Sequence, residues 1–161
     1  MYLYPILMIG LVALTVFCAA MSLFFAALMR HPEDTVHRVA RFWGNACLLI
    51  SGVRVRVSGL DRIPRGLPVI FVANHQGNYD IFTLLGKIPA QFRWIAKKEV
   101  FAIPLLGPAM KKAGYISIDR ENREKAIRSM DEAAAKIRQG KSVMTFPEGT
   151  RSPDGSIGPF K

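Results

Sequence analysis

Charged side chains are absent from the first 29 residues of this 161-residue chain, and cysteine is scarce throughout. All 22 basic and 12 acidic side chains follow that stretch, so the sequence argues against a wholly soluble protein. The two cysteines, Cys18 and Cys47, form neither a disulfide framework of the secreted kind nor a CxxC metal-binding pair, and we expect a reducing compartment. With hydrophobic residues at 50%, the chain is too apolar to be disordered and has the size of one domain.

Residues 1–29 form an uninterrupted apolar run. At about 1.5 Å per helical residue, this run is long enough to cross a hydrocarbon core of about 30 Å. A full crossing and a shallow re-entrant insertion both fit, because Pro5 and Gly10 could interrupt the helix. No basic side chain precedes the run, which argues against a cleaved signal peptide and predicts a cell-membrane protein whose main part lies on the cytoplasmic face. The basic residues that follow it are Arg30, Arg38, Arg41, Arg54 and Arg56.

A second helix is predicted directly after this segment. Pro32 and two acidic residues suit a first helical turn, and apolar residues then recur at helical spacing over roughly 19 residues. Two interpretations stay open: a core helix, or a helix lying in the plane of a membrane with Trp43 as an anchor. His31 and His37 have no suitable partners nearby, and we expect both to be solvated. Residues 1–50 therefore form a membrane segment followed by an amphipathic helix.

The rest of the chain, residues 51–161, alternates between strand and helix patterns. The continuous apolar run at 67–73 predicts a strand buried on both faces. This alternation predicts an α/β fold with a mixed, largely parallel sheet flanked by helices, preceded by the N-terminal membrane-associated helical segment. The predicted strands are 53–57, 67–73, 92–96, 115–118 and 142–146, and the predicted helices are 81–85, 103–113 and 121–139.

Polar clusters follow three of these strands directly, at residues 74–80, 119–120 and 147–152. In parallel sheets, sites form beyond the carboxyl ends of the strands. We therefore expect the three clusters to share one pocket.

The first cluster contains His75 and Asp80, five residues apart. On one continuous helix their side chains would be about 140° out of alignment, but they can converge if His75 lies on a loop and Asp80 in the first turn of the next helix. Asp80 would then accept a hydrogen bond from one ring nitrogen and leave the other basic. No Ser or Cys lies within the motif, so the simplest chemistry is deprotonation of a substrate hydroxyl, with a purely structural hydrogen bond as the alternative. A zinc site is disfavoured, since no second His or Cys has ligand spacing.

The third cluster suits a phosphate. Gly149 allows close backbone approach, Thr150 offers a hydroxyl and Arg151 offers a planar guanidinium fork. Glu148 would repel a phosphate, so we expect it to orient Arg151 or to bond a substrate hydroxyl. Arg120, after its own strand, is a second candidate phosphate contact. The alternatives are a surface turn with a solvated Arg151 and an ion pair between Arg120 and a neighbouring glutamate.

Residues 87–112 hold six basic residues and one acidic residue. A solvated face is one interpretation, and attraction to anionic lipid headgroups or to an acidic carrier of the substrate is another. Nucleic acid is not expected as a partner, because no recognisable binding module is present.

Three motifs together resemble the glycerolipid acyltransferase family, in order and in approximate spacing. They are Asn74-His75 with Asp80, GYISIDR at 114–120, and FPEGTRS at 146–152. The resemblance covers about residues 65–161, and the apolar N-terminus is also in the expected place. Lys97-Lys98, Ile103-Pro104 and Gly107 are similar to family positions too, whereas Gly77 stands where many members carry a serine.

The resemblance implies transfer of a fatty acyl group from an acyl-CoA or acyl-carrier-protein thioester to the free hydroxyl of lysophosphatidic acid, giving phosphatidic acid. Another lysolipid or glycerol 3-phosphate is the alternative acceptor. The implied partners are these two substrates and the bilayer, with no cofactor and no metal. His75 would be the general base and Asp80 its partner. The implied acceptor phosphate site is Arg120, Glu148, Gly149, Thr150 and Arg151.

Members of the family normally continue well past the Pro-Phe-Lys at which this sequence stops, so we expect 51–161 to be an acyltransferase domain truncated at its C-terminus. Two further hypotheses compete with an active acyltransferase. One is an inactive, membrane-attached lipid-binding fragment. The other is a hydrolase that uses Ser117 or Ser152 as its nucleophile.

Overall fold

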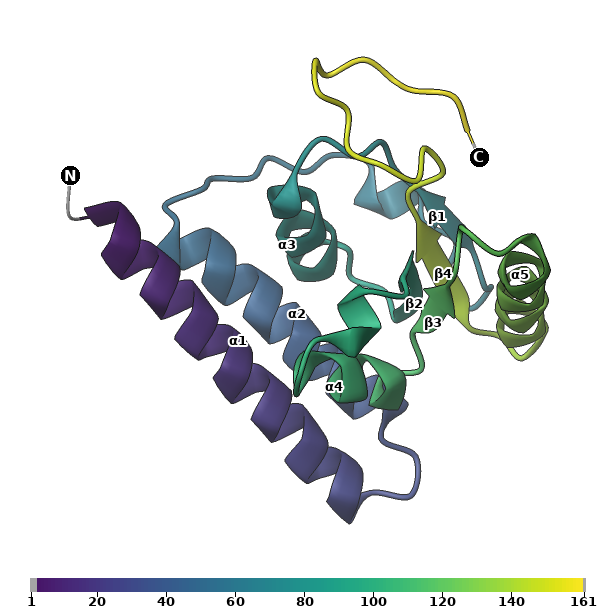
Figure 1. Cartoon of the computed structure of the whole chain (residues 1–161), viewed down its shortest axis with the longest axis horizontal. Helices are drawn as coiled ribbons and strands as arrows, with labels where there is room; N and C mark the ends of the chain where they lie inside the picture. Colours follow the sequence, from purple (N-terminus) through teal and green to yellow (C-terminus); the bar gives the residue numbers. More distant parts are fainter. Residues whose placement is uncertain (1–2, 161) are drawn as a thin grey trace.

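Two long helices lie side by side at one edge of the molecule in the computed structural model, which describes residues 3–160 (Figure 1). They are α1 (Leu3–Leu28) and α2 (Glu33–Ile50), and they run antiparallel along each other. α1 continues without a break through Pro5 and Gly10. Pro5 lies in the first turn, where the missing N–H has no intrahelical partner to lose.

α1 is apolar around its whole circumference but is buried on one side only. Cys18, Ala19, Ser22 and Ala26 face the rest of the protein. By length and composition, Tyr4–Leu28 could cross a membrane, with a mean hydropathy of 2.5. The exposed large apolar side chains of this helix are Tyr4, Ile6, Ile9, Val12, Val16, Phe17, Phe24 and Leu28.

α2 buries one face against α1 and against α3 (Asn78–Lys87), which supports its interpretation as a core helix. The expectation that His37 is solvated is wrong, because its side chain is 0% exposed. Its Nδ1 lies 2.9 Å from the hydroxyl oxygen of Tyr115, and its ring packs edge-to-face on Phe92. Both partners are more than fifty residues away in sequence, so nothing near His37 reveals them.

The sheet has four strands in the order β1-β4-β2-β3, and every pair is parallel. α3 and α4 (Leu106–Lys112) lie on the side that faces α1 and α2, whereas α5 (Arg123–Arg138) lies on the opposite side (Figure 1). The α/β prediction is confirmed. The strands are β1 (Ile70–Val72), β2 (Phe92–Lys97), β3 (Ile116–Ile118) and β4 (Ser142–Thr145), and short 3-10 turns occupy Leu60–Arg62 and Val100–Ala102.

Side chains that alternate along the strands contribute to two separate apolar clusters. Phe92, Trp94 and Met144 belong to the larger cluster, on the side of the long helices. Ile116 and Val143 belong to the smaller one, which α5 covers.

Two predicted strands differ in the structure. Residues 53–57 form no strand, since Val53 and Val57 stay exposed and no neighbouring strand pairs with them. The strand predicted at 67–73 shortens to β1, and it is not buried on both faces, because Ile70 and Val72 are 59% and 57% exposed. β1 is an edge strand, and the contacts of α5 with the sheet are with β3 and β4.

Candidate active site

His75 lies on the loop between β1 and α3, and Asp80 lies in the first turn of α3. The Nδ1 atom of His75 is 2.8 Å from Oδ2 of Asp80. The same carboxylate oxygen accepts hydrogen bonds from the backbone N–H groups of Gln76, at 2.6 Å, and Gly77, at 2.9 Å. The loop-and-helix arrangement expected for this pair is the one observed.

These contacts favour the ionised form of Asp80. Partial burial alone would raise the pKa of this carboxyl. Hydrogen bonds from the Gly77 N–H, the His75 ring and the Gln76 N–H outweigh burial, so the pKa lies below its ordinary value. An ionised carboxylate only accepts hydrogen bonds. Nδ1 of His75 therefore carries the hydrogen, and in the neutral ring Nε2 carries the lone pair.

The imidazole is also fixed from β4 and the segment after it. Its ring stacks on Phe146, with 4.0 Å between the ring centroids and 9° between the planes. The backbone N–H of His75 donates to Oε1 of Glu148 at 2.9 Å, and its carbonyl oxygen accepts from the N–H of Ser152 at 2.7 Å. β1 and β4 are neighbours in the sheet, which is why these two distant segments meet.

Glu148 was expected to orient Arg151 or to bond a substrate hydroxyl. Among the described residues it makes no hydrogen bond or ion pair with Arg151, and it is only 3% exposed. Its two oxygens accept from the backbone N–H groups of His75 and Gly158, each at 2.9 Å. The glutamate thus joins two stretches of backbone.

The two arginines lie at the same mouth but are held differently. Arg120 donates from Nη1 to the carbonyl oxygen of Gly149, and neither Glu121 nor Glu124 pairs with it among the described residues. Arg151 is exposed, with Nη1 3.4 Å from Oδ1 of Asn78. All of the expected phosphate residues except Glu148 line the cavity described next.

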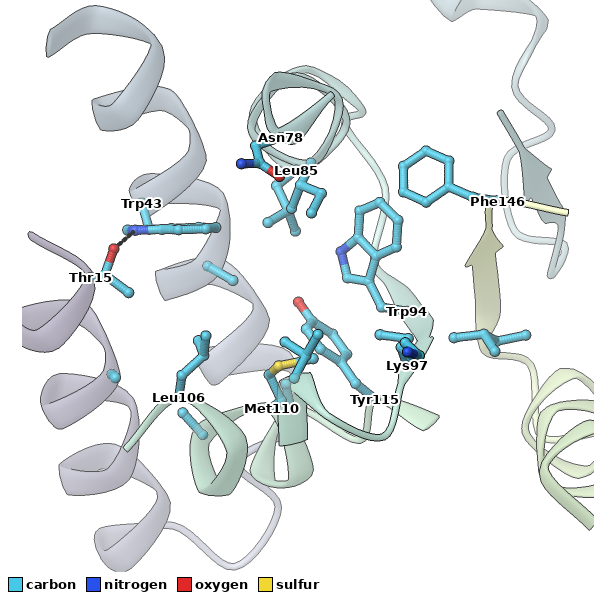
Figure 2. A pocket seen from close by; sticks show the side chains of 18 of the residues that line it. Thr15, Trp43, Asn78, Leu85, Trp94, Lys97, Leu106, Met110, Tyr115 and Phe146 are labelled. Carbon is cyan, nitrogen blue, oxygen red and sulfur yellow. Dashed lines mark hydrogen bonds between the residues drawn. The ribbon is translucent and has the colours of Figure 1, made fainter. Parts of the chain in front are cut away.

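A cavity of about 770 Å³ opens at His75 and runs between the sheet and the helices. Its mouth is polar, with His75, Arg120, Thr150 and Arg151. Its interior is lined by apolar and aromatic side chains, and Figure 2 shows Trp94 and Phe146 on one side of it and Trp43 on the other. Trp43 donates from Nε1 to the hydroxyl of Thr15 on α1, at 3.0 Å. α1 therefore supplies part of the cavity wall.

The sequence reasoning missed Phe146 as the stacking partner of His75 and Trp94 and Tyr115 as lining residues. Phe146 lay within a quoted motif, but only the pairing of β1 with β4 brings it to the histidine. Trp94 and Tyr115 lie on or beside strands that were predicted, but nothing in the sequence of these strands indicates which side chains line a cavity.

The contacts argue against two other hypotheses from the sequence, the hydrolase and the uniformly solvated basic face. Ser152 donates its hydroxyl hydrogen to Asp154 rather than to His75, and Ser117 lies on β3 away from the histidine's partners. The described residues hold no group of three or more metal-ligating side chains. Within 87–112, Arg93 is 1% exposed and contacts Asp34, so this stretch is not uniformly a solvated face.

A histidine–carboxylate pair thus lies beside two arginines at the mouth of an apolar cavity. The model of the Acyltransferase family matches residues 54–161. The chain belongs to the Acyltransferase family.

Relatives and a solved structure support the same assignment. The chain is 32% identical to the chloroplastic 1-acyl-sn-glycerol-3-phosphate acyltransferase BAT2 of Brassica napus, over 82% of this chain and 38% of that protein. It is 39% identical to the alpha form from Homo sapiens, over 68% of this chain and 39% of that protein. The crystal structure of the 1-acyl-sn-glycerophosphate acyltransferase PlsC of Thermotoga maritima matches with a TM-score of 0.81 and 31% identity, over 99% of this chain and 64% of that chain. The chain thus spans about two fifths of the length of the curated relatives it matches.

Proposed function

We propose that this chain carries the acyl-transfer site of a 1-acyl-sn-glycerol-3-phosphate acyltransferase. The reaction moves a fatty acyl group from a thioester, of coenzyme A or of an acyl-carrier protein, to the free hydroxyl of lysophosphatidic acid. The names and identities of the relatives support lysophosphatidic acid as the acceptor. The hydrogen bond between His75 and Asp80, at the mouth of the cavity, is the observation that supports acyl transfer at this site.

In this proposal His75 is the general base and Asp80 its orienting partner. Nε2 of His75 takes the proton of the acceptor hydroxyl as its oxygen attacks the thioester carbonyl carbon. The carbon–sulfur bond then breaks, and the thiolate receives the proton from the imidazolium and leaves as a thiol. No acyl-enzyme forms, which agrees with the absence of a serine or cysteine side chain among the hydrogen-bond partners of the His75 imidazole within the described residues.

Arg120 and Arg151 would bind the acceptor phosphate, helped by the hydroxyl of Thr150 and the close backbone approach at Gly149. Arginine suits this task because its planar fork donates two parallel hydrogen bonds to phosphate oxygens. The long 3.4 Å contact between Arg151 and Asn78 leaves that guanidinium free to turn toward a ligand. The apolar interior of the cavity would hold an acyl chain.

The exposed apolar face of α1 would attach the protein to the cell membrane, with the site on the cytoplasmic face. Eight large apolar side chains in contact with water would be costly, at about 25 cal/mol for each Å² exposed. A lipid surface removes that cost and brings the cavity, whose wall includes α1, close to its amphiphilic substrates.

The test is acyl transfer by the purified protein in mixed micelles, with acyl-CoA and acyl-carrier protein as donors. Lysophosphatidic acid, other lysolipids and glycerol 3-phosphate are compared as acceptors. We expect lysophosphatidic acid to give the highest kcat/KM and the variant His75→Ala to lose at least 10³-fold in kcat. Full transfer by His75→Ala would refute the role of the base, and no transfer by the unaltered chain would favour the lipid-binding fragment.

A further inference from the structure

Glu148 is the one expected phosphate-site residue that does not line the cavity, and it is the most deeply buried acidic side chain at the site. We propose that Glu148 is a positioning residue, whose carboxylate holds the backbone of His75 at the distance from the phosphate-binding mouth that the reaction requires. This inference rests on the proposed function and assigns Glu148 a task other than contact with the acceptor.

Both oxygens of Glu148 are already used by the protein. Oε1 accepts from the N–H of His75 and Oε2 from the N–H of Gly158, each at 2.9 Å. Two N–H donors facing one side chain require an acceptor at both ends, which an ionised carboxylate provides and an amide does not. Charge-assisted bonds of this kind are roughly twice as strong as neutral ones.

Contact with the acceptor would need a different arrangement. Within residues 3–160, no arginine or lysine nitrogen lies within 4.0 Å of this carboxylate, although Arg120 and Arg151 lie at the same mouth. A carboxylate facing the bound phosphate would also repel it. With its side chain 3% exposed, Glu148 faces the backbone behind the histidine.

The bond from Glu148 to His75 is one of several hydrogen bonds that connect residues 74–77 with residues 148–158. The Ser152 N–H donates to the His75 carbonyl at 2.7 Å, and Nε2 of Gln76 donates to the carbonyl oxygen of Gly155 at 3.3 Å. Residues 149–151 of the same segment supply the mouth of the cavity. Glu148 therefore couples the position of the base to that of the phosphate-binding residues.

The decisive variant is Glu148→Gln, which keeps the size of the side chain but turns an NH₂ group toward one of the two donors. We expect kcat to fall on the order of 10²-fold while KM for lysophosphatidic acid stays within about twofold, because misplacing a reacting group by about 1 Å has an effect of this size. Amide hydrogen exchange should accelerate at His75 and Gly158. The matched control is Glu132→Gln on the exposed face of α5, which should change neither quantity.

If Glu148 instead contacts the acceptor, Glu148→Gln should raise KM and leave kcat nearly unchanged. That result would overturn the proposal. Unchanged kinetics in Glu148→Gln would overturn it as well. If Glu148→Gln does not fold, Glu148→Asp retains the charge but is one methylene too short to reach both donors, and the same kcat-selective loss is expected at about tenfold. If the unaltered protein transfers no acyl group, the proposed function fails, and hydrogen exchange still decides whether Glu148 holds the loop.

Discussion

The ring of His75 lies flat on the ring of Phe146, 4.0 Å from centroid to centroid and 9° from parallel. The two residues follow β1 and β4, which are neighbours in the sheet, and Trp94 packs against Phe146 with 5.3 Å between the ring centroids. The stack fixes the plane of the imidazole, whereas the hydrogen bond to Asp80 fixes the direction in which Nδ1 points within that plane. The geometry of the candidate base therefore depends on an apolar residue as much as on its charged partner.

Replacing Phe146 by leucine should lower activity as well as stability. The variant Phe146→Leu keeps an apolar side chain, so we expect a loss of about 1 to 2 kcal/mol in the free energy of unfolding. With the stack removed, the imidazole can tilt, and kcat should fall roughly tenfold. Steady-state kinetics and thermal unfolding in the same detergent measure the two effects. Met144→Leu, a buried change of similar volume on the same strand, should leave kcat unchanged, and an unaltered kcat in Phe146→Leu would contradict this role of the stack.

Asp80→Asn should remove the charge beside His75 while keeping the hydrogen bonds of the loop. One oxygen of Asp80, Oδ2, accepts from Nδ1 of His75 and from the N–H groups of Gln76 and Gly77, and an asparagine oxygen in its place can still accept from all three. The neutral amide no longer stabilises the positively charged imidazole that forms when Nε2 takes a proton. We expect kcat to fall on the order of 10²-fold or more, measured beside Asp131→Asn on α5 as the control. A loss below tenfold would show that the charge of Asp80 does not assist the base.

His37 should make folding stability depend on pH. Burial, together with the positive charges of Arg93 and Arg41, lowers the pKa of His37 to about 3. In the unfolded chain a histidine takes up its proton near pH 6.5. The folded state resists that uptake, so stability is complete above about pH 6.5 and declines toward pH 3 by at most about 1.4 kcal/mol per pH unit.

The variant His37→Gln removes this titration while keeping a hydrogen-bonding group for Tyr115. We expect denaturant unfolding between pH 7 and pH 4 to show a shallower fall in stability for His37→Gln than for the unaltered protein. Equal slopes would mean that His37 takes up a proton in the folded state, and the proposed effect of its burial would be wrong.

Gly44 sets how closely α2 approaches α3. A Cβ atom at this position would lie 2.8 Å from the carbonyl oxygen of Phe82 and 3.0 Å from Cβ of Leu85. Because α3 carries Asp80 in its first turn, pushing the two helices apart should also disturb the site. Gly44→Ala is expected to lower the free energy of unfolding by about 1 to 3 kcal/mol. Gly10→Ala on α1 meets no atom within 4 Å and serves as the control, with unchanged or slightly higher stability expected.

The sequence was most informative where one local pattern settles an element. The helical spacing after Pro32, the strand pattern of 92–96 and the glycine after residue 139 predict α2, β2 and the end of α5 to within a few residues. The convergence of His75 with Asp80 was also predictable, because both lie on one loop-and-helix unit.

Contacts between distant segments were not predictable from such patterns. Alternation at 53–57 suggested a strand, but a strand needs a partner, and none pairs with it in the described sheet. The burial of His37 depends on Tyr115, 78 residues further along the chain. The orientation of Glu148 depends on two backbone N–H groups, which leave no trace in residue types. In each case tertiary packing decided what local composition left open.

The pairing of β1 with β4 also means that β1 is synthesised well before the strand it pairs with. The two segments that meet at His75 and Glu148 are 73 residues apart, which a ribosome working at 5–20 residues per second covers in about 4 to 15 seconds. During that interval β1 has emerged without the strand that pairs with it, so the backbone N–H and C=O groups that bond β4 in the folded protein have no partner strand. The nascent chain therefore passes through a stage prone to aggregation, in which a chaperone could shield β1.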